Sequence, residues 1–256
     1  MILHAMEVGE GPPVVLLHGL FGSARNLAAV QRALSSRHRV IAMDLRNHGA
    51  SPHAAGMDYA TQAADVRQTM QAHGVPAAAV VGHSMGGKTA MRLALDTPAV
   101  VSALAVADIA PVPYPPHFRD YAETMRGVPG GVSRAAADAL LAGVVEDPGV
   151  RGFLLQNLRP GETPAWRIGL DNIAEALPDI EGWETPTEAR YDGPVLIVAG
   201  DRSDYVQAEH RGAIRTLFPR ARFVKVRNAG HWMHADNLPG FVSVLDAFLS
   251  RTVGSG

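Results

Sequence analysis

Cysteine is absent from this chain of 256 residues. Its absence excludes disulfide bonds, thiolate metal sites and a cysteine nucleophile, and it is typical of proteins in a reducing compartment. The first eleven residues, MILHAMEVGEG, lack the charged segment and apolar segment of a secretory signal peptide. We therefore expect a cytoplasmic location.

Long apolar runs and blocks of one charge are also missing. The longest apolar stretches, such as 14–17 and 195–199, have the length of a strand and are too short to cross a bilayer. The chain has 23 basic and 25 acidic residues, and no basic run indicates a surface for nucleic acid or anionic lipid. We expect no nucleic-acid or membrane partner, and a protein that is a monomer or a homodimer.

What the sequence does contain is an alternation of short apolar runs with helix-like segments. The runs that we predict as strands are 14–17, 40–43, 78–81, 103–107, 195–199 and 221–226. Several are apolar on both faces, which is typical of a parallel sheet covered by helices. Polar residues or glycine follow each run, and ligands of such sheets bind at the carboxyl ends of the strands. The sequence therefore predicts one α/β domain with a mostly parallel central sheet flanked by helices.

The alternation breaks after residue 110, where the proline-rich turn PVPYPP begins. The amphipathic segments that follow, which we predict as helices, are 117–127, 133–145, 150–157 and 164–177. Because they lie between two strands at the predicted active edge, we expect them to form a cap over the site. The predicted division is a core of 1–110 and 191–256 with a helical cap of 111–190.

Residues 82–89 read GHSMGGKT and fit two unrelated catalytic motifs. As G-x-S-x-G they match the nucleophile elbow of a serine hydrolase, with Ser84 as the nucleophile. As G-x4-G-K-T they match a Walker A phosphate loop, for which Asp108 would supply the Walker B acid. Both motifs need a strand before them and a helix after them, and the sequence predicts both, at 77–81 and from about 85 to 95. The octapeptide alone does not decide between the two.

Two features elsewhere in the chain favour the serine hydrolase. His18 and Gly19 follow the first predicted strand, where such enzymes use a backbone N–H to hold the oxyanion. We expect the amides of Phe21 and Met85 to be the two donors. His231 follows the last predicted strand, and the order serine, acid, histidine is found in one large class of serine hydrolases. We expect His231 to act as the general base.

Three aspartates at predicted strand ends could orient His231. Asp108 ends one strand, and Asp201 and Asp204 follow the next strand in the segment GDRSDYV. Serine hydrolases of this order commonly carry their acid in that segment, but the usual position is occupied by Ser203. The residues alone leave Asp108 and Asp204 about equally open, with Asp201 behind them.

Taken together, these motifs resemble the α/β-hydrolase superfamily, and within it a subgroup of compact bacterial esterases and their mitochondrial relatives in animals. The segments that carry the resemblance are HGLFGS at 18–23, DLRNHGAS at 44–51, GHSMGGK at 82–88, DIAPV at 108–112, EGW at 181–183 and AGHWMHAD at 229–236. Members of this subgroup are carboxylesterases or thioesterases, some of them acting on acyl-coenzyme A, and they need no metal or nucleotide. The resemblance implies Ser84 as nucleophile, His231 as base and Asp108 as acid. This chain departs from the subgroup at Asp204, a position that is not usually acidic, and the extra carboxylate stays as the alternative acid.

We therefore expect a cofactor-free serine carboxylesterase that acts on small to medium acyl esters. The alternatives on the same scaffold are an acyl-CoA thioesterase and a C–C bond hydrolase or perhydrolase. The side chains and backbone that we expect beside the substrate are those of His18, Gly19, Leu20, His83 and Trp232. Lys88 is interpreted as a structural residue paired with an acid of the core, and Asp44 and Arg46 as residues that fix loops beside the site.

Overall fold

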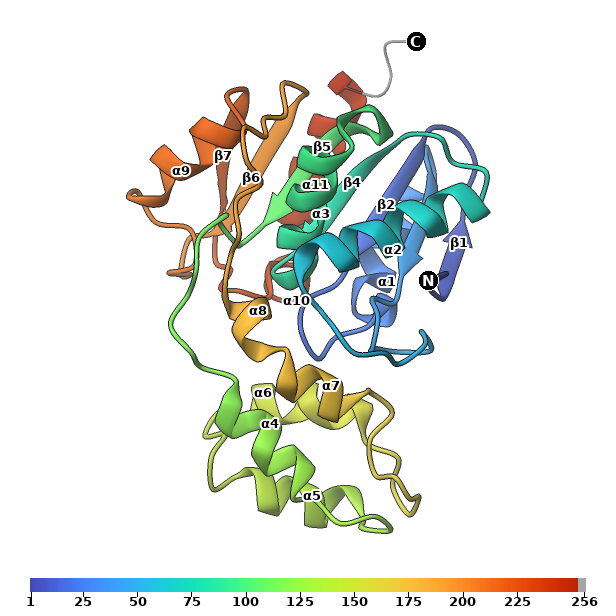
Figure 1. Cartoon of the computed structure of the whole chain (residues 1–256), viewed down its shortest axis with the longest axis vertical. Helices are drawn as coiled ribbons and strands as arrows, with labels where there is room; N and C mark the ends of the chain where they lie inside the picture. The colour runs from blue at the N-terminus through green and yellow to red at the C-terminus, as the bar shows by residue number, and fades with distance from the viewer. Residues whose placement is uncertain (253–256) are drawn as a thin grey trace.

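The computed structural model describes residues 1–252, so the last four residues of the predicted core segment 191–256 lie outside the described part. Its centre is a seven-stranded sheet with the order β1-β3-β2-β4-β5-β6-β7 (Figure 1). β1 runs antiparallel to β3, and every other neighbouring pair is parallel. The predicted α/β fold with a mostly parallel sheet is confirmed. The strands are β1 (Ala5–Val8), β2 (Pro13–Leu17), β3 (Arg39–Met43), β4 (Ala78–His83), β5 (Val101–Ala107), β6 (Val195–Gly200) and β7 (Ala221–Val226).

Helices cover both faces of this sheet. In β2, Val14 and Leu16 contribute to a core shared with α1 and α11, whereas Val15 and Leu17 contribute to a core shared with α2, α3 and α9. Alternate side chains of a strand point to opposite faces, so a strand covered on both faces is apolar at every position. The helices of this part of the chain are α1 (Ala28–Leu34), α2 (Tyr59–Ala72), α3 (Met85–Asp96), α9 (His210–Leu217), α10 (Met233–Asp236) and α11 (Leu238–Thr252), with short 3-10 turns η1 (Ala24–Leu27) and η2 (Pro98–Val100).

The segment between β5 and β6 is helical, as predicted. Figure 1 shows α4 to α7 gathered at one end of the molecule, with α8 leading the chain back to the sheet. The expected helix at 164–177 begins only at Leu170, and Trp166 before it forms a β-bridge with Leu158. The elements of this insert are α4 (Arg119–Arg126), α5 (Arg134–Leu141), α6 (Pro148–Leu154), η3 (Leu155–Asn157), α7 (Leu170–Glu175) and α8 (Leu177–Glu181).

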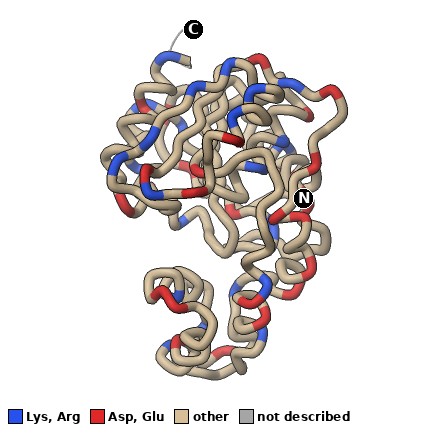
Figure 2. Tube along the Cα trace, turned by 90° about the vertical axis from the view of Figure 1, so that its left-hand side faces the viewer, with Lys and Arg blue, Asp and Glu red and all other residues tan. Residues whose placement is uncertain are grey.

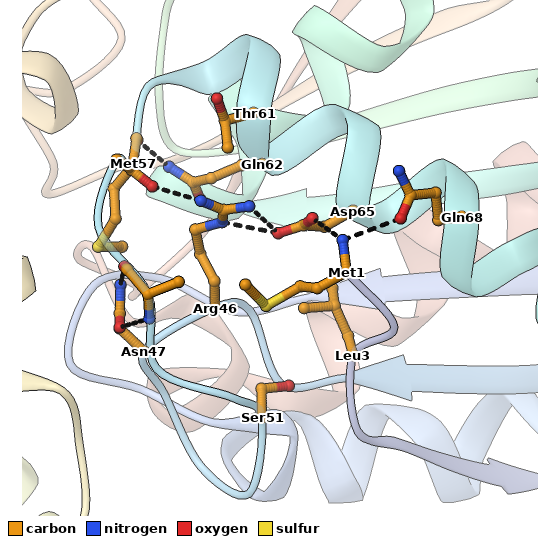
Figure 3. A network of polar contacts seen from close by, with 12 residues as sticks. Met1, Leu3, Arg46, Asn47, Ser51, Met57, Thr61, Gln62, Asp65 and Gln68 are labelled. Atoms are coloured by element: carbon orange, nitrogen blue, oxygen red, sulfur yellow. Dashed lines mark hydrogen bonds and ion pairs between the residues drawn. The ribbon is translucent and has the colours of Figure 1, made fainter.

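The polar loop that follows β3 is held by its own side chains. Asp44 accepts hydrogen bonds from the backbone amides of Ala24 and Ala50 at 2.7 and 2.9 Å. The buried Arg46 donates to the carboxylate of Asp65 at 2.6 Å (Figure 3). These contacts fix the loop against η1 and α2, which agrees with the structural role expected for Asp44 and Arg46.

Charged residues of both signs are interspersed along the core and the insert (Figure 2). An example in the insert is Arg126, which forms ion pairs with Glu123 at 3.2 Å and with Asp171 at 2.8 Å. Within residues 1–252, no helix combines the length and the apolar character needed to cross a membrane.

Candidate active site

Ser84 lies at the sharp turn between β4 and α3. Its backbone has φ of 52° and ψ of −120°, a conformation that non-glycine residues seldom adopt and that costs about 1–3 kcal/mol. A Cβ atom at Gly82 would meet the carbonyl oxygen of Gly86, and one at Gly86 would meet carbonyl oxygens of Leu17 and His18. The two glycines are therefore required by close backbone approach. The turn places Ser84 at the carboxyl end of the sheet, at the N-terminus of α3.

His231 and Asp108 meet beside this turn. The Nδ1 atom of His231 lies 2.8 Å from Oδ2 of Asp108, whose side chain has no exposed surface. Oδ1 of Asp108 accepts a hydrogen bond from the Gly200 amide at 3.1 Å, and the Ser203 hydroxyl donates to Oδ2. A buried carboxylate that accepts these bonds fixes the hydrogen of His231 on Nδ1 and leaves Nε2 with a lone pair.

The other two aspartates considered as the acid lie elsewhere. Asp204 is exposed and lines a neighbouring cavity. Asp201 accepts a hydrogen bond from the Ala229 amide, and backbone hydrogen bonds hold the pKa of its carboxyl below the usual value. Sequence reasoning treated Ser203 only as a non-acidic residue. β5 and β6 are adjacent, so Ser203 after β6 lies next to Asp108 at the end of β5. A hydroxyl at the usual acid position was therefore the signal that could have indicated a partner of Asp108.

Phe21, the first of the two expected oxyanion donors, does not fit that role in this structure. Its amide donates to Nε2 of His48 at 3.0 Å and is therefore not directed at a substrate. The preceding residue, Leu20, fits the role, because the hydrogen bonds of residues 1–252 include none from its amide. Leu20 also borders both cavities described below. The second expected donor, Met85, begins α3, where backbone N–H groups have no partner within the helix.

Aromatic rings surround His231. Tyr205 stacks on it with ring centroids 4.0 Å apart, and Nε2 of His83 lies 2.8 Å from the His231 carbonyl oxygen. Burial lowers the pKa of His83 well below its usual value, and burial together with His231 lowers the pKa of His234 to about 4. Both rings are thus neutral at pH 7, so they shape the site without adding charge beside His231.

Two cavities adjoin Ser84. The first, which we call the histidine cavity, has a volume of about 200 Å³ and contains His231. All five residues expected beside the substrate line it, namely His18, Gly19, Leu20, His83 and Trp232, together with side chains of the insert such as Phe118, Tyr121, Phe153 and Leu154. The second, the lysine cavity, has a volume of about 320 Å³ and is lined by Met85, Lys88, Tyr114, Ile180, Glu181 and Asp204 among others.

Lys88 and Thr89, the residues that a phosphate loop would direct at a nucleotide, are engaged in the core. The Lys88 ammonium donates to the carbonyl oxygens of Glu181 and Gly182 at 3.2 and 2.6 Å, so its partners are backbone groups and not a carboxylate. The Thr89 hydroxyl lies 3.0 Å from the Met85 carbonyl. In the described part of the chain, no group of three or more His, Asp or Glu side chains is placed to hold a metal ion.

The comparisons with known proteins agree with this geometry. The family model of the alpha/beta hydrolase fold matches residues 12–144. The chain is 41% identical to the sn-1-specific diacylglycerol lipase ABHD11 of Mus musculus over 93% of this chain and 81% of that protein. It is 35% identical to esterase YbfF of Escherichia coli strain K12, with 96% of each chain covered. A solved structure described as a marine microorganism esterase superposes with a TM-score of 0.92 at 32% identity and covers 97% of this chain and 99% of its own. The chain belongs to the alpha/beta hydrolase family.

Proposed function

We propose that the protein is a serine carboxylesterase that hydrolyses small to medium acyl esters through an acyl-enzyme. The observation that carries the proposal is the 2.8 Å contact between His231 and the buried Asp108, in a cavity shared with a serine in strained backbone conformation. Relatives named as an esterase and a lipase support ester bonds as the target.

In the proposed mechanism, Ser84 attacks the ester carbonyl while Nε2 of His231 takes its proton. The tetrahedral oxyanion is held by the amides of Leu20 and Met85, and each such donor contributes about 3–4 kcal/mol to lowering the barrier. His231 then gives the proton to the leaving alcohol, and a water molecule activated by the same ring hydrolyses the acyl-enzyme. Asp108 keeps the imidazole in the required tautomer and stabilises the imidazolium.

The two cavities suggest where the two halves of the ester bind. The leaving oxygen must come within hydrogen-bond distance of His231, which lines the histidine cavity, so we place the alcohol there. The acyl group then extends into the lysine cavity past Met85. The helical insert 111–190 acts in this proposal as a cap, since Phe118 borders both cavities. Rates over acyl esters and acyl-CoA thioesters of graded chain length would measure the preference directly.

Replacement of the nucleophile tests the proposal. Ser84→Ala should reduce hydrolysis of p-nitrophenyl butyrate to the background rate, because no covalent intermediate can form, and should abolish labelling by a fluorophosphonate probe. Ser102→Ala is the matched control, since Ser102 is an exposed serine on β5 away from both cavities. Turnover or labelling of the Ser84→Ala variant at the wild-type level would refute the assignment.

A further inference from the structure

The backbone N–H and carbonyl groups of Phe21 are each hydrogen-bonded to a side chain, and the two side chains come from different parts of the fold. Its amide donates to Nε2 of His48 in the loop after β3, at 3.0 Å. Its carbonyl oxygen accepts a hydrogen bond from Nδ2 of Asn157 in the insert, at 2.7 Å. Phe21 has φ of 58°, a conformation that costs a non-glycine residue about 1–3 kcal/mol and persists only where the surroundings impose it. The two bonds supply that constraint.

On the core side, His48 can only accept from Phe21. Its ring has no exposed surface, and its Nδ1 lies 2.8 Å from the carbonyl oxygen of Arg46, so Nδ1 carries the hydrogen and Nε2 the lone pair. Burial lowers the pKa of His48 to about 3. The ring therefore stays neutral across the pH range of an ordinary esterase assay, and Nε2 remains available as an acceptor for the Phe21 amide.

On the insert side, Asn157 is itself fixed. It ends η3, its side chain is 5% exposed, and its own carbonyl oxygen accepts from the Arg167 amide at 2.9 Å. The Asn157 amide group thus ties the Phe21 carbonyl to the frame of the insert.

The consequence falls on Leu20. The carbonyl of Gly19, which shares a planar peptide unit with the Leu20 N–H, accepts from Nδ1 of His18 at 2.8 Å. The next peptide unit contains the Phe21 N–H held by His48. Because its own peptide plane and the next one are both held by hydrogen bonds, the direction of the Leu20 N–H is fixed.

We infer that His48 and Asn157 are positioning residues that set the oxyanion loop, and that Asn157 couples the placement of the insert to the reaction. The inference rests on the proposed ester hydrolysis with Leu20 as an oxyanion donor. It predicts that the two side chains affect the transition state more than the binding of the ester, because the oxyanion forms only as Ser84 attacks.

A second bond between the same two segments provides a control. Nδ2 of Asn26, in η1, donates to Oε1 of Gln156 at 2.8 Å, in an exposed position next to Asn157. Gln156→Ala removes a link between insert and loop without touching the Phe21 peptide. If the contacts served only to dock the insert, Gln156→Ala and Asn157→Leu would have similar effects.

The experiment measures kcat and KM for p-nitrophenyl butyrate, with Tm recorded for each variant. Asn157→Leu should lower kcat about tenfold to a hundredfold with KM changed less than about threefold, since a misplaced donor forfeits part of its stabilisation. Affinity for an alkyl boronic acid, which forms a tetrahedral adduct on serine, should fall by a similar factor. His48→Phe should behave like Asn157→Leu, whereas His48→Gln, which can present an acceptor oxygen, should recover most of the loss.

Two results would overturn the inference: an equal fall in kcat for Gln156→Ala, or unchanged kcat in both Asn157→Leu and His48→Phe. If Asn157→Leu does not fold, the comparison of His48→Phe with His48→Gln decides, and equal kcat in that pair also overturns the inference. Failure of the proposed function looks different, because wild-type protein would then show no Ser84-dependent hydrolysis at all.

Discussion

Asp108 is the residue whose surroundings are most completely specified. It accepts from His231 Nδ1, the Gly200 amide and the Ser203 hydroxyl, and it has no exposed surface. A carboxylate held by three donors cannot turn away from the imidazole. Asp204, four residues past Gly200, is exposed and has no such set of donors.

Substitutions of Asp108, Ser203 and Asp204 should therefore lower kcat to different extents. Asp108→Asn should lower kcat by about 10⁴, because an amide can stabilise the wrong tautomer of His231. Ser203→Ala should cost less, about tenfold, since one hydrogen bond to the carboxylate is lost and the carboxylate remains. Asp204→Asn should leave kcat within about twofold. Steady-state kinetics with p-nitrophenyl butyrate measures all three, and a larger loss in Asp204→Asn than in Asp108→Asn would reverse the choice of acid.

Sequence reasoning reached the identity of these residues unevenly. Ser84 and His231 could be proposed from short motifs, because the elbow and the position after the last strand leave few candidate residues. The choice between Asp108 and Asp204 could not be made from the residues alone, since both follow strands that end at the same edge. The expected donor Phe21 gave way to the proposed donor Leu20, because only the folded loop reveals that the His48 ring accepts from the Phe21 amide.

At the scale of elements, Lys88 joins α3 to the end of α8. Its ammonium donates to two carbonyl oxygens there, and it lies 4.9 Å from the centroid of the Tyr114 ring and 5.5 Å from that of Tyr59. Burial lowers the pKa of Lys88 to about 7, with a partial opposing effect of Glu181. The contact between α3 and the end of the insert therefore depends on Lys88, whose charged form is destabilised by burial.

Lys88→Met should change how stability depends on pH. Between about pH 7 and the usual lysine pKa near 10.4, the unfolded chain holds a proton on Lys88 that the folded protein has lost. The contribution of Lys88 to the free energy of unfolding therefore rises by about 1.4 kcal/mol per pH unit in this range. Below pH 7 both states are protonated and the slope vanishes. Urea unfolding from pH 7 to 10 should show a shallower rise for Lys88→Met. Lys225→Met, at the other lysine of the chain, which is exposed on β7, should match wild type; equal slopes in all three proteins would contradict the assignment.

The elements themselves were predicted where burial imposes a pattern. Strands covered on both faces appear as continuous apolar runs, which is how β2 to β6 were predicted. β7 is a half-buried edge strand, and it was predicted because apolar residues alternate with Arg222 and Lys225. β1 was missed because it lies at the sheet edge, and its residues, AMEV, are half-buried or exposed and form no such run. The helix expected from 164 starts at Leu170, and Trp166 before it donates its indole N–H to the Met125 carbonyl at 2.7 Å.

At the scale of the whole molecule, burial lowers the pKa of five histidines; His38 directly precedes β3, and the other four lie at the opposite edge of the sheet. Burial lowers the pKa of His18, takes that of His48 to about 3, lowers that of His83 well below its usual value and, with His231, takes that of His234 to about 4. They follow β2, β3 and β7 or end β4, so all lie at the carboxyl edge that carries the site. The polar edge needed for chemistry is thus also the part of the fold that acid should disturb first.

The free energy of unfolding should therefore fall as the pH drops below about 6.5, the usual pKa of histidine. In that range the unfolded chain binds protons that the buried rings refuse, so each ring contributes a loss of about 1.4 kcal/mol per pH unit until its own folded pKa is reached, near 3 for His48. Urea unfolding at pH 6.5, 5.5 and 4.5 measures the slope. His48→Gln should reduce the slope by one proton's contribution, whereas His53→Gln should leave it unchanged, because the His53 ring is exposed to solvent in the folded protein. Identical slopes for His48→Gln and wild type would mean that His48 is protonated in the folded state, and a protonated His48 could not accept the Phe21 amide.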